Sequence, residues 1–171
     1  MSIAMHELTQ PPFAQTLAAL SGVLAKAEAH AALKKFDAGV LLGARLAPDM
    51  FPLSRQVEIA CDLAASSLAR LTGVEVPSWR AEAKTIADLR AHIAKTLAYL
   101  GAFKPGDIDG TEAREITLSL AGKPVTMAAK PYLFQFVLPN FYFHATIAYA
   151  ILRHNGVDLG KRDFLGEVPG L

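Results

Sequence analysis

The sequence predicts an all-α protein: a bundle of four helices with one short β-hairpin between the third and the fourth helix. Two observations support this fold class. Apolar residues recur at helical spacing in four long segments. One short region between the third and fourth segments alternates strictly, which is the period of a strand. Because 171 residues suffice for one hydrophobic core, we expect a single domain over residues 1–171.

The first two helices are expected at His6–Ala29 and Leu53–Leu71. The first follows a proline pair and has a simple apolar row, Phe13, Leu17, Leu20 and Leu24. The second has a longer row and a glycine stop at Gly73; the row is Leu53, Val57, Cys61, Ala64, Leu68 and Leu71. The linking stretch is expected to hold one short helix near Asp37–Leu42.

The third helix is expected at Thr85–Leu100, with Asp88 in its first turn, where a carboxylate favours the helix dipole. Before it, Trp79 is expected to cover one end of the bundle, and His92 on the helix is expected at the surface. After it, EITLSL and VTM alternate and are separated by AGKP, which predicts a hairpin of Glu115–Leu120 and Val125–Met127. Its apolar face would be Ile116, Leu118, Leu120, Val125 and Met127.

The fourth helix lies in the stretch Leu133–Leu152, which contains no charged residue and is long enough to be compared with a membrane span. Proline is best tolerated at the first helical position, so we expect the helix at Pro139–Asn155, before Gly156. About 17 residues give roughly 25 Å, which is short for a span. We therefore expect a buried helix and no membrane partner. The tail from Lys161 is read as a short turn and a loose terminus.

Composition excludes several classes of function. Net charge is +1 and basic residues are scattered among acidic ones, so we expect no nucleic-acid partner. Hydrophobic residues make up 52% of the chain, which suits either a compact, well-buried protein or an oligomer that hides further surface, and we expect a homodimer. Cys61 is the single cysteine, so no disulfide framework is expected. The first residues carry no secretory signal pattern, and we expect a cytoplasmic protein.

Asn140 and His144 lie one turn apart on the otherwise apolar fourth helix and are the best candidates for a site. Three interpretations remain open for them. They could hold a metal ion, line a hydrogen-bonded polar pocket, or be core residues whose polar atoms are satisfied internally.

Two further motifs resemble a known family. HATIAYAILRHNG is similar to the last helix of the DinB/YfiT-like superfamily of four-helix bundles. DMFPLSRQVEIACD and NFYFHATIAYAILRHNGVDLGKRDFLG resemble a bacterial domain-of-unknown-function family within it, and the resemblance covers essentially the whole chain. It implies a DinB-like bundle and a dimer. Where a metal is bound in that superfamily, one histidine of the second helix and two of the last helix hold it. The matching positions here are Gln56, Asn140 and His144.

This departure from three histidines disfavours a metal, because neutral amide oxygen is a poor ligand for first-row divalent ions. A carboxylate would have to join His144, and Asp62 or Glu58 of the second helix could do so. With Arg55 nearby, however, such a stripe is usually a solvated, ion-paired face. We therefore predict no cofactor and keep a divalent metal at His144 and Asp62 as the alternative.

Three functions follow as hypotheses. The first is a small-molecule binder whose cleft is lined by Gln56, Asn140, Tyr142 and His144. The second is a metal-dependent transferase or hydrolase of the DinB-like kind. The third is a non-catalytic homodimeric scaffold. Reaction and substrate are left open.

Overall fold

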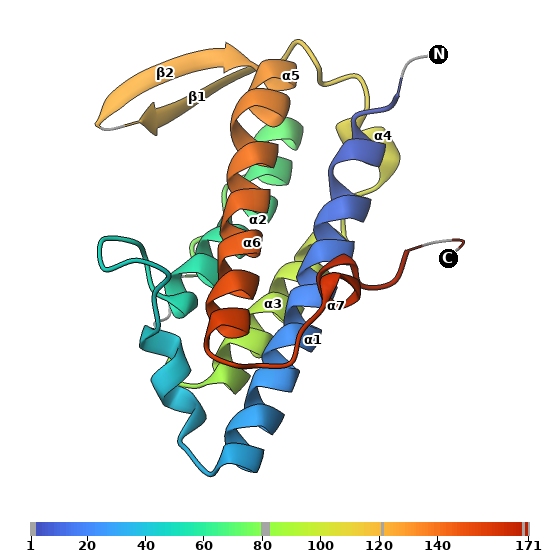
Figure 1. Cartoon of the computed structure of the whole chain (residues 1–171). Coiled ribbons are helices and arrows are strands. Elements are labelled where there is room, and N and C mark those ends of the chain that lie inside the picture. Colours follow the sequence, from blue (N-terminus) through green and yellow to red (C-terminus); the bar gives the residue numbers. More distant parts are fainter. Residues whose placement is uncertain (1–2, 80–82, 121, 169, 171) are drawn as a thin grey trace.

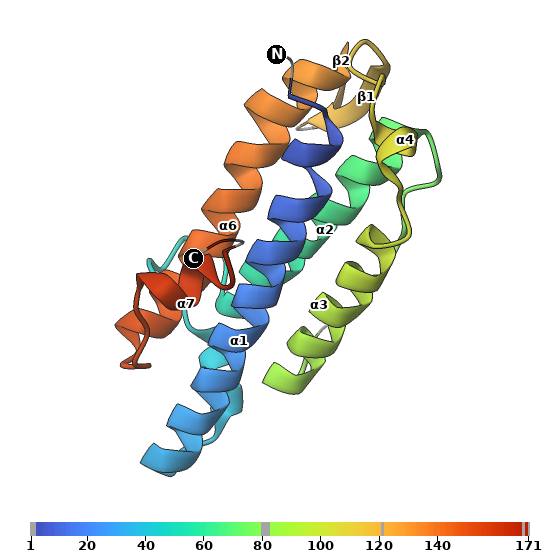
Figure 2. The same ribbon diagram turned by 90° about the vertical axis from the view of Figure 1, so that its right-hand side faces the viewer.

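The computed structural model describes residues 3–79, 83–120, 122–168 and 170. Four long helices lie side by side and form the bundle that the sequence predicts (Figures 1 and 2). They are α1 (Gln10–Lys34), α2 (Leu53–Thr72), α3 (Ile86–Leu100) and α6 (Leu138–His154).

The long helices pack in the cyclic order α1, α3, α2, α6, and α1 also contacts α2 across the bundle. α1 and α3 are antiparallel. The Gln10 amide at the start of α1 donates to the Leu100 carbonyl at the end of α3, and Arg90 near the start of α3 pairs with Glu28 near the end of α1. α2 and α6 are also antiparallel, because Arg70 near the end of α2 reaches Tyr132 just before α6. Figure 2 shows that α2 and α3 run in the same direction, opposite to α1 and α6.

The apolar rows predicted for the first three helices face the core. All of the residues predicted for the rows of α1 and α2 are buried, as are Ile86, Leu89, Ile93 and Leu100 of α3. Leu97 is half-buried. Burial raises the pKa of the Cys61 thiol to about 12 against an opposing hydrogen bond from Thr96, so this thiol stays protonated inside the core.

The N-terminal third differs from the prediction at the boundaries of helix one. A 3₁₀ turn, η1 (His6–Leu8), precedes α1, which begins at Gln10 rather than His6. α1 then continues past Ala29 to Lys34, because AALK favours a helix, and ends at Lys35 in the left-handed conformation, φ 58°. The short helix predicted near Asp37–Leu42 is the 3₁₀ helix η2 (Ala38–Gly43), which the Asp37 side chain caps.

α3 begins where predicted, with Thr85 as its cap. The Thr85 hydroxyl accepts from the Asp88 N–H, and the Asp88 carboxylate accepts from the Thr85 N–H, which is a capping box. Trp79 packs on the side of α3, against His92 and Tyr99, rather than over an end of the bundle. His92 is correspondingly half-buried and not at the surface. A further short helix, α4 (Pro105–Ile108), was not predicted.

The hairpin is formed by β1 (Glu115–Leu120) and β2 (Lys123–Ala128), paired antiparallel. It projects from one end of the bundle (Figure 1). Ile116 pairs with Met127 and Leu118 with Val125, so the predicted apolar face is present. The second strand starts two residues earlier than predicted and includes Pro124, which an edge strand tolerates. Of the predicted loop, residue 121 lies outside the described residues.

α6 matches the predicted fourth helix, but the chain is already helical before it. A helical turn, α5 (Ala129–Pro131), leads into a π-helical stretch, η3 (Tyr132–Val137), which runs into α6. Pro139 lies in the first turn of α6, where the missing N–H is tolerated. The proline therefore marks a change of helix type rather than the start of the helix.

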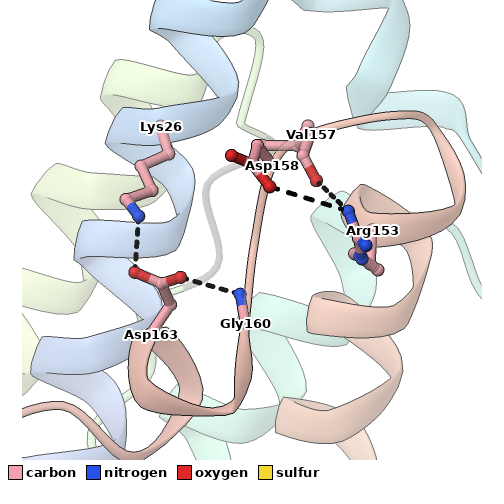
Figure 3. A network of polar contacts seen from close by, with 6 residues as sticks. All are labelled: Lys26, Arg153, Val157, Asp158, Gly160 and Asp163. Carbon is pink, nitrogen blue, oxygen red and sulfur yellow. Dashed lines mark hydrogen bonds and ion pairs between the residues drawn. The ribbon is translucent and has the colours of Figure 1, made fainter.

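The tail is more ordered than predicted, because residues after α6 fold back onto α1. A short helix, α7 (Lys161–Leu165), packs against α1. Lys26 of α1 pairs with Asp163 at 2.6 Å, and the same carboxylate accepts from the Gly160 N–H at 2.8 Å (Figure 3). Arg153 at the end of α6 donates to the Val157 carbonyl, which holds the turn between the two helices.

None of the helices in the described residues combines the length and the apolar character that crossing a membrane requires.

Candidate functional site

The packing of α2 against α6 brings Gln56 and His144 together, 88 positions apart in the chain. His144 Nδ1 lies 2.6 Å from Gln56 Oε1. The Gln56 side chain is buried, with 1% of the residue exposed, and its Nε2 donates to the Phe51 carbonyl at 3.0 Å. Both polar atoms of a buried amide are thus satisfied, one by the loop before α2 and one by α6.

This arrangement fixes the tautomer of His144. If the Gln56 amide were turned over, its oxygen would face the Phe51 carbonyl, and two acceptors would oppose each other. Gln56 Oε1 therefore faces the imidazole and can only accept. Nδ1 of His144 carries the proton that it donates, and Nε2 carries the lone pair.

The lone pair on Nε2 is open to solvent. In the described part of the chain, the buried side-chain nitrogen and oxygen atoms that lack a hydrogen-bond partner are His92 Nε2 and the Tyr99 hydroxyl. Among the residues that the structure describes, His144 Nε2 has no hydrogen-bond partner and does not belong to that group, from which we infer that it reaches the surface. His144 is half-buried, and the ring of Phe143 stands edge-on to it with 5.2 Å between ring centroids. An incoming ligand would meet a hydrogen-bond acceptor beside an aromatic ring.

The surroundings keep His144 neutral. Burial lowers the pKa of the imidazole below its ordinary value, and the positive charge of Arg55 lowers it further. Arg55 itself is paired with Glu58 at 3.1 Å and lies 3.8 Å from Asp62. On α2, Arg55 is therefore ion-paired with Glu58 and Asp62, as their spacing predicted.

Asn140 is one turn before His144 but is not hydrogen-bonded to it. Its Nδ2 donates to the Phe136 carbonyl at 2.7 Å, in the π-helical stretch that precedes α6. The amide thereby completes the hydrogen bonding at the junction between the two kinds of helix. This contact gives Asn140 a structural role, and its part in a ligand site stays a prediction.

Tyr142 lies on a different side of α6 from His144, since the two residues are two positions apart. Burial raises the pKa of the phenol above its ordinary value, and the neighbouring Thr16 of α1 opposes that rise. The structure thus joins Gln56 and His144 and places Tyr142 against α1.

Sequence reasoning missed Phe51 and Phe143. The role of Phe51 rests on its backbone carbonyl, which carries no signal in the residue type. Phe143 could have been noticed as an aromatic residue adjacent to His144 on the surface of the helix.

The donor set does not fit a metal held by three protein side chains. No group of three or more His, Cys, Asp or Glu side chains suited to an ion occurs within residues 3–79, 83–120, 122–168 and 170. Gln56 stands at one of the positions that the resemblance implies. Its oxygen already accepts a hydrogen bond from His144, and its nitrogen already donates to the Phe51 carbonyl. One imidazole nitrogen is left, which alone is a weak site for zinc.

Replacement of Gln56 by alanine should lower the free energy of unfolding by about 1–3 kcal/mol, because the Phe51 carbonyl and His144 Nδ1 would lose their partner. Urea denaturation measures this. Gln135→Ala is the matched control, since Gln135 is exposed and the same atoms are removed. Equal losses in the free energy of unfolding for the two substitutions would contradict the stabilising role assigned to the two hydrogen bonds of Gln56.

The lowered pKa of His144 also predicts a dependence of stability on pH. The folded protein binds the His144 proton less readily than the unfolded chain, whose histidine titrates near 6.5. Between the lowered pKa and about 6.5 the unfolded state therefore carries more protons, and stability rises with pH. On acidification below about 6.5 the free energy of unfolding should fall.

His144→Gln should flatten this part of the stability profile, which denaturation between pH 5 and 7.5 measures. His154→Gln, at the exposed end of α6, should leave it unchanged. An unchanged profile in His144→Gln would show that another group is responsible.

Comparison with known proteins agrees with the fold and the sequence motifs. A family model described as a domain of unknown function (DUF1993) matches residues 5–165. The crystal structure of a DinB family member protein from Shewanella denitrificans is similar, with a TM-score of 0.86 and 44% identity over 96% of this chain and 93% of that chain. No curated protein matches.

The family match extends from η1 to α7 and therefore includes both Gln56 and His144. The resemblance inferred from the motifs of α2 and α6 is confirmed, and so is the helical bundle with its short hairpin. The chain belongs to the DUF1993 family and has a DinB-like fold.

Proposed function

We propose that this protein binds a small molecule at the Gln56–His144 pair. The observation that carries the proposal is the hydrogen-bonded series from the Phe51 carbonyl through Gln56 to His144 Nδ1. It holds the imidazole in one orientation and one tautomer before any ligand arrives. Binding therefore costs little further conformational entropy of this side chain.

The chemistry of the pair indicates what kind of ligand would fit. A neutral imidazole offers an acceptor at Nε2, so the ligand should present an O–H or N–H donor. Phe143 is 51% exposed beside it and offers an apolar ring for contact. Arg55 already has carboxylate partners and provides less attraction for an anion than an unpaired arginine would. A small, neutral molecule with a donor group on an apolar body matches these features.

A metal-dependent activity is the second candidate, and one observation favours it. Metal-binding histidines usually donate their other ring nitrogen to an oxygen acceptor, as His144 does to Gln56. The neighbouring donors do not complete a metal site, and we derive no reaction step from one. The predicted homodimer and the cytoplasmic location also remain predictions; exposed Phe134, Tyr142 and Phe143 offer apolar surface to a second copy.

The binding proposal predicts a difference between phenol and anisole. Phenol has the hydroxyl donor, and anisole is similar in shape without it. In ¹H–¹⁵N spectra, phenol should shift the resonances of Gln56, Phe143 and His144 at concentrations where anisole has little effect. His144→Ala should abolish the response, while His154→Ala, on the same helix, should retain it.

Equal responses to phenol and anisole would contradict a ligand recognised through Nε2. Titration with zinc chloride is the parallel experiment. One equivalent bound tightly to the wild type and lost in His144→Ala would support the metal-dependent candidate instead.

A further inference from the structure

The helix that carries His144 is irregular just before α6. η3 (Tyr132–Val137) is π-helical and runs into α6 without a break. In a π-helical turn the backbone hydrogen bonds span five residues instead of four, so one such turn takes up one extra residue. Turns of this kind frequently occur at functional sites. The residues after η3 are therefore rotated about the helix axis from the positions that a regular α-helix would give them.

Two contacts with α2 show what this rotation achieves. Arg70 donates to the Tyr132 hydroxyl at 3.1 Å, and Gln56 meets His144 at 2.6 Å. On α2, which is one continuous α-helix, Gln56 and Arg70 are 14 positions apart and lie within about 40° of each other around the axis. Tyr132 and His144 must likewise lie on one side of their own helix, the side that faces α2.

A regular α-helix would not place Tyr132 and His144 on one side. They are 12 positions apart, and at about 100° per residue this separation leaves them about 120° apart around the axis. With one extra residue taken up in η3, the separation is equivalent to that of 11 positions in a regular helix, which leaves only about 20°. Leu133 and Ala145 are also 12 positions apart, and both are buried, which agrees with the smaller angle.

Asn140 closes the junction between η3 and α6. Pro139 has no N–H and so removes one backbone donor from this junction. Asn140 Nδ2 adds a donor there, because it bonds to the Phe136 carbonyl at 2.7 Å. A side chain that bonds to the carbonyl four residues earlier competes with the regular backbone bond, so this contact stabilises the irregular geometry.

We propose that the extra residue of η3 turns His144 towards Gln56, and that Asn140 is a positioning residue that holds this arrangement through the Phe136 carbonyl. Asn140 then acts on the ligand site through the orientation of His144 and does not touch the ligand. The effect on ligand binding rests on the function proposed above, whereas the effect on the orientation of the imidazole does not.

A deletion and an insertion in η3 test the rotation. Deletion of Gln135, an exposed residue of η3, removes the extra residue and should give a regular α-helix in which His144 still faces Gln56. Insertion of one alanine after Gln135 should turn His144 by about 100°, away from Gln56. Long-range ¹H–¹⁵N spectra at pH 7.5 should show a protonated Nδ1 of His144 in the deletion variant and not in the insertion variant. The same result in both variants would overturn the proposal.

Substitutions of Asn140 test its positioning role. Asn140→Leu removes the donor, whereas the hydroxyl of Asn140→Thr can still bond to the Phe136 carbonyl, as helical threonines do in this protein: Thr72 bonds to Leu68 and Thr96 to His92. Asn140→Leu should weaken phenol binding about tenfold, and Asn140→Thr should bind within about twofold of the wild type.

Asn155→Leu is the matched control, because Asn155 Nδ2 makes the same kind of bond, to the Ile151 carbonyl at the far end of α6, and its loss should leave phenol binding unchanged. Loss of binding in Asn140→Thr with an unchanged His144 ring spectrum would place the Asn140 amide against the ligand and overturn the positioning role. Unchanged binding and an unchanged ring spectrum in Asn140→Leu would overturn it as well. If phenol does not bind the wild type, the proposed function fails, while the ring spectra still test the positioning role.

Discussion

The buried amide of Gln56 is the constraint around which the candidate site is built. An amide with 1% exposure costs free energy unless its oxygen and its nitrogen both find partners. Here the partners come from two different parts of the chain, the loop before α2 and the middle of α6. The same two bonds that satisfy the amide therefore join α2 to α6 and set the orientation of His144.

From this constraint the properties of His144 follow in sequence. An acceptor at Nδ1 places the proton there and leaves the lone pair on Nε2. Partial burial and the charge of Arg55 both oppose a second proton. The result is a neutral, oriented acceptor at the surface of an apolar helix, at the position where the DinB resemblance implies a metal ligand. Gln56 and Asn140 stand where that resemblance implies two histidines, which supports the proposal that the site recognises a donor group rather than an ion.

Much of the fold could be predicted from the sequence because its signals are local. The apolar rows of α2 and α3, the Thr85–Asp88 capping box and the alternation in β1 each arise from neighbouring residues. The end of α1, the helix α7 and the helical turns before Pro139 could not be predicted in the same way. They depend on tertiary contacts, such as the pairing of Lys26 with Asp163, or on a π-helical stretch that leaves no periodic signal.

The site was predictable only in part, for the same reason. The pairing of Gln56 with His144 agrees with the family resemblance, which placed them at matching positions of facing helices. The tautomer depends on the Phe51 carbonyl, and a backbone atom has no signature in the sequence. His92 was predicted at the surface from its position on α3. In the structure it is covered by Trp79, which lies 13 positions earlier in the chain. Neither contact follows from helical periodicity.

The properties of this site depend on Gln56 holding His144 as a neutral imidazole that is protonated at Nδ1. A long-range ¹H–¹⁵N correlation spectrum of the histidine rings at pH 7.5 tests it directly, because the two ring nitrogens differ in shift according to which one carries the proton. We expect a protonated Nδ1 and an unprotonated Nε2 for His144, with this pattern lost in Gln56→Ala. A ring protonated at Nε2, or at both nitrogens, would contradict it.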